Sequence, residues 1–130
     1  GIKTARCKSL PNMSSDPKYL YHYTTAEAAL QIAQSGYIKG STGPGDCALG
    51  PGGYFTSKPP QTSTQNLLIN NYDSAARQHK RTDAQAYVRI PAHEVHAVDG
   101  RSHLGRDVFV VPGSHVDLPA GTKFGFRQGR

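Results

Sequence analysis

Three side chains with different chemistry occupy distinctive local settings in this chain of 130 residues. His22 stands between two tyrosines in an apolar run that leads into a helix start. Tyr54 follows a pair of glycines, and Asp107 opens the apolar run of residues 108–111. An imidazole, an aromatic ring and a carboxylate can together hydrogen-bond, stack on and electrostatically stabilise a flat, charged molecule. The pattern therefore suggests a site that binds a nucleotide.

Each of these residues also has a purely structural interpretation. A lone His such as His22 is commonly a hydrogen-bonded structural residue. The glycine pair before Tyr54 and Phe55 lets a ligand approach the backbone, but it is equally typical of a β-bulge beside core aromatic rings. Asp107 is one of nine acidic residues, and a carboxylate at a strand end commonly faces water. The functional interpretation depends on all three residues occurring together.

A strand predicted over residues 19–23 positions His22. Side chains of a strand alternate between its two faces, so Tyr21 and Tyr23 share one face and His22 takes the other. With both tyrosines in the core, His22 is expected to open onto a cleft. Residues 24–27 read Thr-Thr-Ala-Glu and match a capping box, so a helix N-terminus, which favours anions, is expected beside that cleft.

The remaining pattern predicts an α+β domain. The first helix is expected to end at Gly36 and to bury one face made of Ala26, Ala29, Leu30 and Ala33. A second helix is predicted over residues 64–80, with buried candidates Leu67, Leu68, Tyr72, Ala75 and Ala76. Short strands are predicted over residues 37–39, 53–57, 84–90, 95–98, 107–111 and 123–126.

The length and composition indicate one small domain. The chain has 14 glycines and 9 prolines, which favour short strands joined by many loops. Residues 1–18 are expected to be an N-terminal arm or linker, and residues 19–130 a single domain. Because the chain starts at Gly1 without Met, we expect a piece of a larger protein or a mature form. No apolar run approaches the ~20 residues that a membrane helix needs.

The charge balance favours anionic partners. Fifteen basic and nine acidic residues give a net charge of +6, which attracts nucleic acid, phosphates or an acidic partner, although such a charge can also serve solubility alone. The only cysteines are Cys7 and Cys47, which allow one disulfide or two free thiols.

Metal and nucleophile motifs are weak. His93, Glu94 and His96 form a small cluster, but two His three apart share a face only on a helix, and Pro91 before them argues against one. We therefore expect no metal. Nucleophile elbows, Walker loops and dinucleotide fingerprints are absent from the sequence.

Taken jointly, residues 20–24, 50–57 and 106–113 resemble ADP-ribosyltransferases of the diphtheria-toxin and poly-ADP-ribose-polymerase kind. More narrowly, they resemble the HYD1-type domains found at the ends of polymorphic toxins, whose signature is His, Tyr and Asp. The resemblance runs from about residue 19 to about residue 118. It implies a small ADP-ribosyltransferase-like fold with two packed, mostly antiparallel sheets and two helices around an NAD cleft.

The resemblance also implies roles for individual residues. The catalytic residues would be His22, which would hydrogen-bond a ribose hydroxyl of NAD, Tyr54, which would stack on nicotinamide, and Asp107, which would stand where most relatives have a catalytic Glu. The backbone of Tyr23 would hold the carboxamide of nicotinamide. The remaining NAD-binding residues would be Thr24 and Ile38 near the adenosine half, Gly53, Phe55 and Arg77.

Two departures from the family pattern concern the rate and the choice of substrate. Residues 72–76 match a helix segment of the relatives, but Arg77 stands where the diphtheria group has a second stacking ring. The carboxylate of Asp107 is one methylene shorter than that of Glu, so the strand or the ribose must lie closer.

The resemblance implies a mono-ADP-ribosyltransferase toxin or effector domain with NAD as its substrate. The acceptor is expected to be a protein or a nucleic acid, and an acidic immunity protein or inhibitor is a further expected partner. We expect a monomer that is secreted or delivered into a target cell and acts in its cytoplasm. The alternatives are an NAD glycohydrolase, a small basic ribonuclease that uses His22 with His93 or His96, and an inactive nucleotide-binding module.

Overall fold

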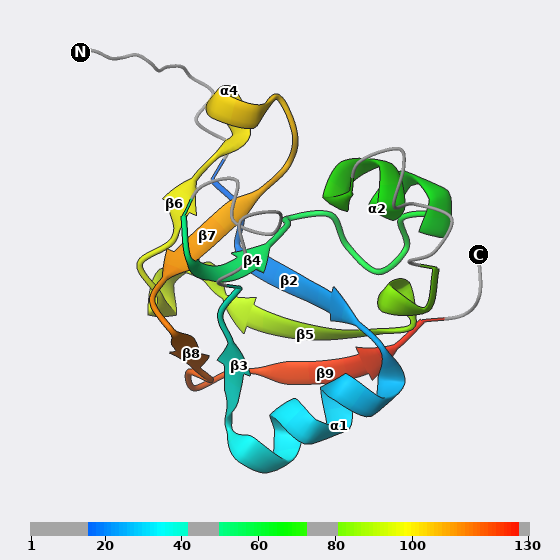
Figure 1. Cartoon of the computed structure of the whole chain (residues 1–130), viewed down its shortest axis with the longest axis vertical. Coiled ribbons are helices and arrows are strands. Elements are labelled where there is room, and N and C mark those ends of the chain that lie inside the picture. The colour runs from blue at the N-terminus through cyan, green and yellow to red at the C-terminus, as the bar shows by residue number, and fades with distance from the viewer. Residues whose placement is uncertain (1–15, 42–49, 73–80, 128–130) are drawn as a thin grey trace.

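The computed structural model describes residues 16–41, 50–72 and 81–127, which fold as an α+β domain (Figure 1). The elements are β2 (Tyr19–Thr24), α1 (Ala26–Ser35), β3 (Tyr37–Lys39), β4 (Gly52–Phe55), α2 (Thr64–Asn71), the 3-10 helix η3 (Arg81–Ala84), β5 (Ala86–Pro91), the 3-10 helix η4 (Ala92–Glu94), β6 (Val98–Asp99), α4 (Arg101–Leu104), β7 (Phe109–Pro112), β8 (His115–Asp117) and β9 (Lys123–Phe126). The expected fold class is confirmed. Among the described residues, no helix has the length and apolar character needed to cross a membrane.

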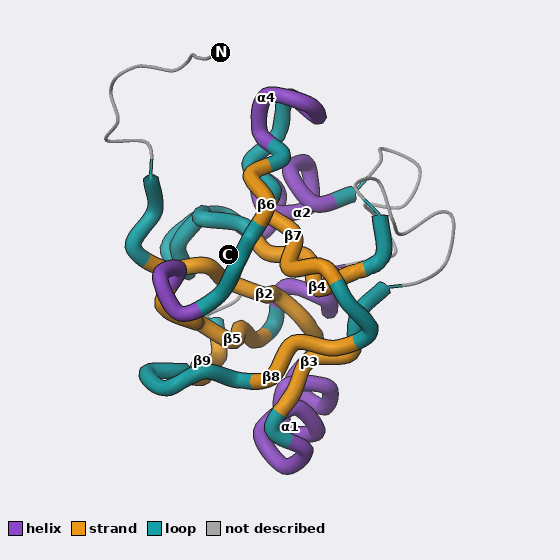
Figure 2. Tube along the Cα trace, turned by 90° about the vertical axis from the view of Figure 1, so that its left-hand side faces the viewer, coloured by secondary structure: helices purple, strands orange, loops and turns teal. Residues whose placement is uncertain are grey.

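Within the described residues, the strands pair in antiparallel ladders that form three small sheets. Their strand orders are β2-β5-β9, β4-β7-β6 and β3-β8. Figure 2 shows β3 and β8 running side by side above α1. Isolated bridges connect the sheets, since Tyr21 pairs with Thr56 and Ser41 pairs with Gly52.

Strands β2 and β5 have two buried faces. One face packs against the other two sheets in a cluster of Leu20, Ile38, Phe55, Val88, Ile90, Phe109 and Val116. The other face packs against α2 and η3 in a cluster of Tyr21, Tyr23, Leu67 and Ala84. The alternation predicted for β2 is therefore confirmed, and it places His22 on the face opposite Tyr21 and Tyr23. The β2-β5 layer is held from both sides, which makes it a rigid support.

Helix α1 begins one residue later than the capping box predicts. The N-cap is Thr25, not Thr24, and its hydroxyl accepts a hydrogen bond from the backbone N–H of Ala28 at 3.1 Å. The expected end at Gly36 is confirmed, because this glycine adopts the left-handed conformation with φ of 85°.

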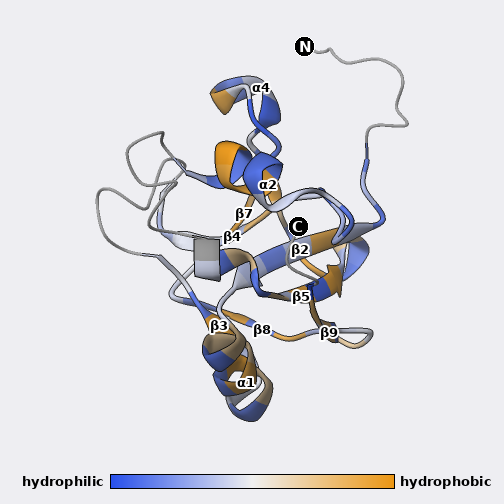
Figure 3. Cartoon of the chain, turned by 90° about the vertical axis from the view of Figure 1, so that its right-hand side faces the viewer, coloured by the Kyte–Doolittle hydropathy of each residue, from blue (hydrophilic) through white to orange (hydrophobic). Residues whose placement is uncertain are grey.

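The buried face of α1 also differs from the prediction. Ala29 is buried and Ile32 packs against the first core cluster, whereas Leu30 is 58% exposed and Ala33 is exposed. Figure 3 shows that α1 and α2 both carry hydrophobic and hydrophilic residues. The helix packs against β3, β5 and β9 along the stripe of Ala29 and Ile32, so the stripe one residue on turns to the solvent.

Other elements follow the sequence to different degrees. The strand predicted over residues 84–90 appears as β5, and the one over 123–126 appears as β9. Of the strand predicted over residues 95–98, only Val98 lies in a strand, the two-residue β6, and residues 95–97 between η4 and β6 belong to no helix or strand. Strand β8 and helix α4 were not predicted. Much of the predicted second helix, including Arg77, lies outside the described residues, as do residues 1–15, Cys7 and Cys47.

Arg127, which follows β9, connects that strand to residues 60–64, which follow β4. The guanidinium of Arg127 donates hydrogen bonds to the carbonyls of Pro60 at 3.2 Å and Ala84 at 2.8 Å, to the carbonyl of Thr62 and to the hydroxyl of Thr64 at 3.1 Å. It also lies over the ring of Tyr23, 5.9 Å from its centroid. The planar guanidinium suits several acceptors at once, which an ammonium group cannot match. Arg127 thereby holds residues 60–64 against β2.

We predict that Arg127→Ala lowers the free energy of unfolding by about 2–4 kcal/mol, because it leaves several carbonyls without their donor. Urea denaturation of wild type and variant measures the difference. Lys123→Ala, which changes an exposed residue of β9, the strand just before Arg127, is the matched control and should change stability by less than ~0.5 kcal/mol. Equal stability of Arg127→Ala and wild type would show that this contact is dispensable.

Candidate functional site

The backbone ladder between β2 and the β4 segment is a single bridge. The N–H and C=O of Tyr21 exchange hydrogen bonds with Thr56 at 2.8 and 2.9 Å. In an antiparallel ladder the next such pair lies two residues further along each strand, which here means Tyr23 and Tyr54. Among the described residues the ladder does not reach that pair. We call the point just beyond the Tyr21–Thr56 bridge the ladder break.

The side chain of His22 occupies the ladder break. Its Nδ1 lies 3.0 Å from the carbonyl oxygen of Tyr54, the acceptor that Tyr23 N–H would use in a continuing ladder. The ring also packs edge-on against Phe55, with centroids 5.8 Å apart. A side-chain donor therefore replaces a backbone donor, and β2 and the β4 segment separate at this point.

One consequence concerns the backbone of Tyr23. Alternate residues of a strand direct their N–H and C=O to opposite sides, so Tyr23 points these groups the same way as Tyr21, away from β5. They face the ladder break, where β4 supplies no ladder partner. A donor and an acceptor side by side can bind a planar amide through two hydrogen bonds. The phenol of Tyr23 is engaged elsewhere, donating to the carbonyl of Lys58 at 2.7 Å.

The hydrogen bond of His22 defines its tautomer. A carbonyl can only accept, so Nδ1 must carry the proton. Desolvation by burial lowers the pKa of His22 below its ordinary value, and the hydrogen bond to the Tyr54 carbonyl opposes this shift in part. A neutral ring protonated at Nδ1 has a lone pair at Nε2. His22 is therefore suited to accept a hydrogen bond from a hydroxyl at Nε2.

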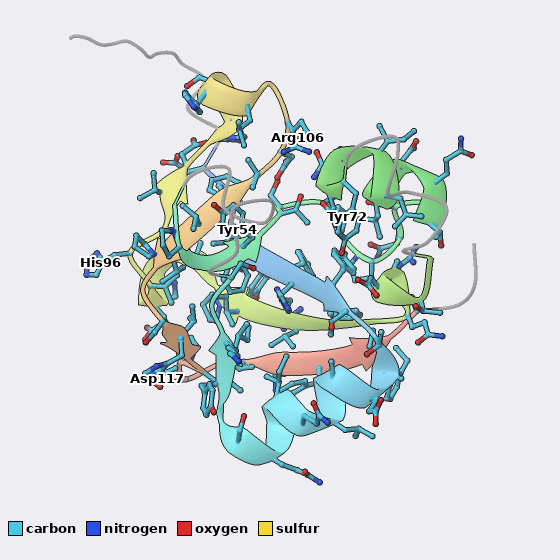
Figure 4. The ribbon with its side chains drawn as sticks, viewed as in Figure 1. Tyr54, Tyr72, His96, Arg106 and Asp117 are labelled. Carbon is cyan, nitrogen blue, oxygen red and sulfur yellow. The ribbon has the colours of Figure 1, made fainter. Side chains whose placement is uncertain are left out.

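Tyr54 lies on β4 between two residues that face the core. Its phenol donates to the carbonyl of Gly50 at 2.7 Å, which fixes the ring direction, and its side chain is half-buried. A Cβ at Gly53 would come within 2.6 Å of the Val116 side chain. Packing inside the protein therefore already requires glycine there, whether or not a ligand approaches. Figure 4 shows Tyr54 near the centre of the domain.

The carboxylate of Asp107 is held by the residues that follow Tyr54. Its Oδ1 accepts hydrogen bonds from the Thr56 hydroxyl at 2.9 Å and from the Ser57 N–H at 2.7 Å. Its Oδ2 accepts one from the Ser57 hydroxyl at 2.5 Å. Three of the roughly four lone-pair sites of a carboxylate are thus used, which leaves one for an outside partner.

The three signature residues therefore meet on one short segment, residues 54–57. His22 contacts the carbonyl of Tyr54, and Asp107 contacts Thr56 and Ser57. Thr56 also forms the bridge to Tyr21, so this one residue connects the carboxylate of Asp107 to β2.

The other sequence-derived binding residues lie in different surroundings. Thr24 is the last residue of β2 and is half-buried, so its side chain is accessible to a ligand. Ile38 and Phe55 are 1% and 3% exposed within the first core cluster. Both support the strands from inside the core, and any part they have in binding NAD is indirect.

The sequence analysis missed Asn70. This residue of α2 is only 8% exposed and hydrogen-bonds both the N–H and the C=O of Asp107. Its position was a usable signal, because it follows Leu67 by three residues and so falls on the apolar face of the helix. A polar residue there needs a buried partner.

The His93–His96 cluster lies away from these residues. His93 and His96 are exposed, and His93 contacts Glu94 at 3.1 Å. Figure 4 shows His96 at the left edge of the domain, apart from Tyr54, whose carbonyl His22 contacts. No contact joins His22 to either residue among the described side chains, so the acid–base pair of a ribonuclease does not form in this arrangement. Among these side chains there is also no group of three His, Cys, Asp or Glu that could hold a metal ion.

A comparison with protein families finds a match over most of the chain. The Tox-ART-HYD1 family model, described as a HYD1 signature containing ADP-ribosyltransferase, matches residues 20–114, which is more than half of the chain. The match includes all three signature residues. No curated protein and no solved structure matches the chain.

The lowered pKa of His22 predicts a pH dependence of stability. The unfolded chain keeps the ordinary value near 6.5, so it takes up a proton before the folded protein does as the pH falls. The contribution of His22 is complete above this value and is lost as the pH falls from it toward the lower folded pKa. Melting temperatures measured between pH 7.5 and 5.5 should therefore fall less steeply for His22→Asn than for wild type.

Asparagine is the appropriate replacement because its amide N–H lies close to the position of Nδ1 and does not titrate. His96→Asn, which removes an exposed histidine, should keep the wild-type slope. The same slope for His22→Asn and wild type would contradict the assignment of His22 as a neutral, desolvated ring.

Proposed function

Because the chain belongs to the Tox-ART-HYD1 family of ADP-ribosyltransferases, we propose that it cleaves NAD at the bond between nicotinamide and ribose and transfers ADP-ribose to a macromolecule. The observation that carries this proposal is the meeting of His22, Tyr54 and Asp107 on residues 54–57 beside the ladder break. We take residues 19–130 as the catalytic domain.

The ladder break is the proposed nicotinamide site. The N–H and C=O of Tyr23 would bind the oxygen and the NH₂ group of the carboxamide, a pairing that neutral amides make well. The ring of Tyr54 would stack on the pyridinium, an arrangement that a cationic ring favours. Phe55 and Gly53 support this place through their packing in the first core cluster.

His22 would position the ribose rather than transfer a proton. Its Nε2 carries the lone pair, so it would accept a hydrogen bond from a ribose hydroxyl. A neutral ring suits this role, because a protonated imidazole has two donors and no acceptor. Thr24 lies two residues further along β2, on the same face as His22, and we propose that it contacts the adenosine half of NAD. Arg77, which follows α2, is proposed as a further NAD-binding residue on the resemblance alone.

The reaction needs little beyond orientation and one negative charge. When the bond between C1′ of ribose and the pyridinium nitrogen breaks, its electron pair leaves with nicotinamide, which becomes neutral and needs no protonation. Positive charge then develops on C1′ and the ring oxygen. The carboxylate of Asp107 would stabilise this charge, as carboxylates do in glycosidases. The acceptor's nucleophile bonds to C1′, and its proton passes to the solvent.

The net charge and the family name indicate the class of acceptor. The net charge of +6 favours a nucleic acid or an acidic protein surface. We propose a protein or nucleic-acid acceptor and delivery of the domain into the cytoplasm of a target cell, as the toxin family name suggests. The second candidate is NAD hydrolysis, because a carboxylate with one remaining lone-pair site could orient a water molecule equally well.

Incubation of the purified domain with NAD labelled in the adenylate and with a cell extract tests the proposal. Release of nicotinamide together with label on protein or nucleic acid supports transfer. Free ADP-ribose with no labelled macromolecule supports the hydrolase, and no nicotinamide release from NAD contradicts both.

Asp107→Asn should reduce kcat for nicotinamide release by ~10²-fold or more, because the amide keeps the size of the side chain but lacks its charge. Thermal melting would verify that the variant is folded. Asp117→Asn removes an exposed carboxylate on β8 and should retain the wild-type rate. A folded Asp107→Asn protein with near-normal kcat would exclude Asp107 as the catalytic carboxylate.

His22→Asn should raise the KM for NAD by ~10-fold or more, since it keeps the donor to Tyr54 but has no acceptor at the position of Nε2. Initial rates over a range of NAD concentrations measure this effect, with His96→Asn as the control. An unchanged KM in the folded variant would mean that the imidazole does not touch the substrate.

A further inference from the structure

We propose that Asn70 is a positioning residue that holds Asp107 in its catalytic geometry. This inference rests on the proposed function of Asp107 and adds to it a residue outside the His-Tyr-Asp signature.

The side-chain amide of Asn70 binds the backbone of Asp107 at two points. Its Oδ1 accepts a hydrogen bond from the N–H of Asp107 at 2.9 Å, and its Nδ2 donates one to the C=O of the same residue at 2.8 Å. Only one orientation of the amide satisfies both contacts, because an N–H needs an acceptor and a C=O needs a donor. Nδ2 also lies 3.3 Å from the Thr56 hydroxyl, which itself donates to the Asp107 carboxylate.

These contacts replace a strand partner that Asp107 lacks. The ladder between β4 and β7 ends at the pair of Phe55 and Phe109, so Asp107 lies two residues before the paired part of β7. In a continuing ladder its partner would be Ser57, but the N–H of Ser57 binds the carboxylate instead. Asn70 hydrogen-bonds the backbone of Asp107 in place of Ser57, and Ser57 binds the carboxylate of Asp107.

The base of this contact is rigid. Asn70 and its neighbour Leu67 are buried on α2, which is capped by the hydroxyl of Ser63 accepting from the N–H of Asn66. Leu67 belongs to the cluster that packs against β2. Asp107 is therefore positioned, through Asn70 and α2, by packing against β2, the strand that carries His22 and Tyr23. Catalysis depends on such alignment, since a misplacement of about 1 Å can cost ~10²-fold in rate.

Removal of the amide should affect turnover more than binding. The backbone of Asp107 would lose two partners, and Thr56 would lose a neighbour that fixes its hydroxyl. The carboxylate would then be less well placed against the charge that develops at C1′. Nicotinamide and ribose recognition by Tyr23 and His22 would remain, because neither residue contacts Asn70.

The test compares kcat and KM for nicotinamide release in wild type, Asn70→Ala and Asn70→Leu. The leucine variant, whose side chain branches at Cγ as that of asparagine does, fills the buried site if the alanine variant does not fold. We expect kcat to fall by ~10-fold or more while the KM for NAD changes by less than ~3-fold. Asn66→Ala, an exposed asparagine on the same helix, should retain both values. A folded Asn70 variant with normal kcat would overturn the proposal.

A second arm separates positioning from a general structural effect. In an Asp107→Ala background, Asn70→Leu should reduce the residual rate no further, because the group it positions is gone. An equal loss in both backgrounds would assign Asn70 a structural role only.

The failure of the proposed function would give a different result. In that case wild type would release no nicotinamide. Hydrogen exchange of the Asp107 amide would still test the contact, and exchange at least ~10-fold faster in Asn70→Leu is expected. Unchanged exchange would contradict the contact itself, whatever the activity.

Discussion

The arrangement of the site depends on the replacement of a backbone hydrogen bond by a side-chain hydrogen bond. The Nδ1 of His22 binds the carbonyl that would otherwise extend the ladder between β2 and the β4 segment. Where His22 takes this carbonyl, the ladder ends after the Tyr21–Thr56 bridge, and the N–H and C=O of Tyr23 face an edge with no ladder partner among the described residues. The same hydrogen bond also fixes the ring tautomer, so the lone pair lies on Nε2. A single contact therefore accounts for both groups that the proposed function assigns to NAD binding on β2, one on the backbone of Tyr23 and one on the side chain of His22.

The carboxylate of Asp107 is held against residues 56 and 57 by contacts that do not involve His22. Thr56 connects the two parts, because its backbone pairs with Tyr21 and its hydroxyl donates to Asp107. Asn70 holds the backbone of Asp107, and Arg127 holds residues 60–64, which follow β4. Thr56, Ser57 and Asn70 hold Asp107 through hydrogen bonds from short side chains and backbone groups. Such support can give an Asp the position near the ribose that most relatives are expected to reach with the longer Glu. The shorter carboxylate is then matched by closer support.

Local sequence patterns predicted the elements whose buried face is set by the alternation of residues along a strand. The strand predicted over residues 84–90 is present as β5, where Ala86, Val88 and Ile90 are fully buried, and the alternation around His22 indicated its face of β2. The signature residues could be found because their types are unusual in their settings. On α1 the burial of Ala29 is confirmed, but Leu30 and Ala33 are exposed and Ile32 packs inward, since which stripe of a weakly apolar helix turns inward depends on the strands it meets. Asn70 was missed for a similar reason: its partner lies 37 residues away, and only the folded chain brings them together.

The central claim is that the ladder break beside Tyr23 binds nicotinamide. The most direct measurement is a titration of the ¹⁵N-labelled domain with free nicotinamide, followed by amide chemical shifts, because it requires no turnover. The account predicts a saturable downfield shift of the Tyr23 amide proton, with smaller changes at His22 and at residues 54–57. Saturable binding that leaves the Tyr23 amide unshifted and perturbs a different surface would contradict it.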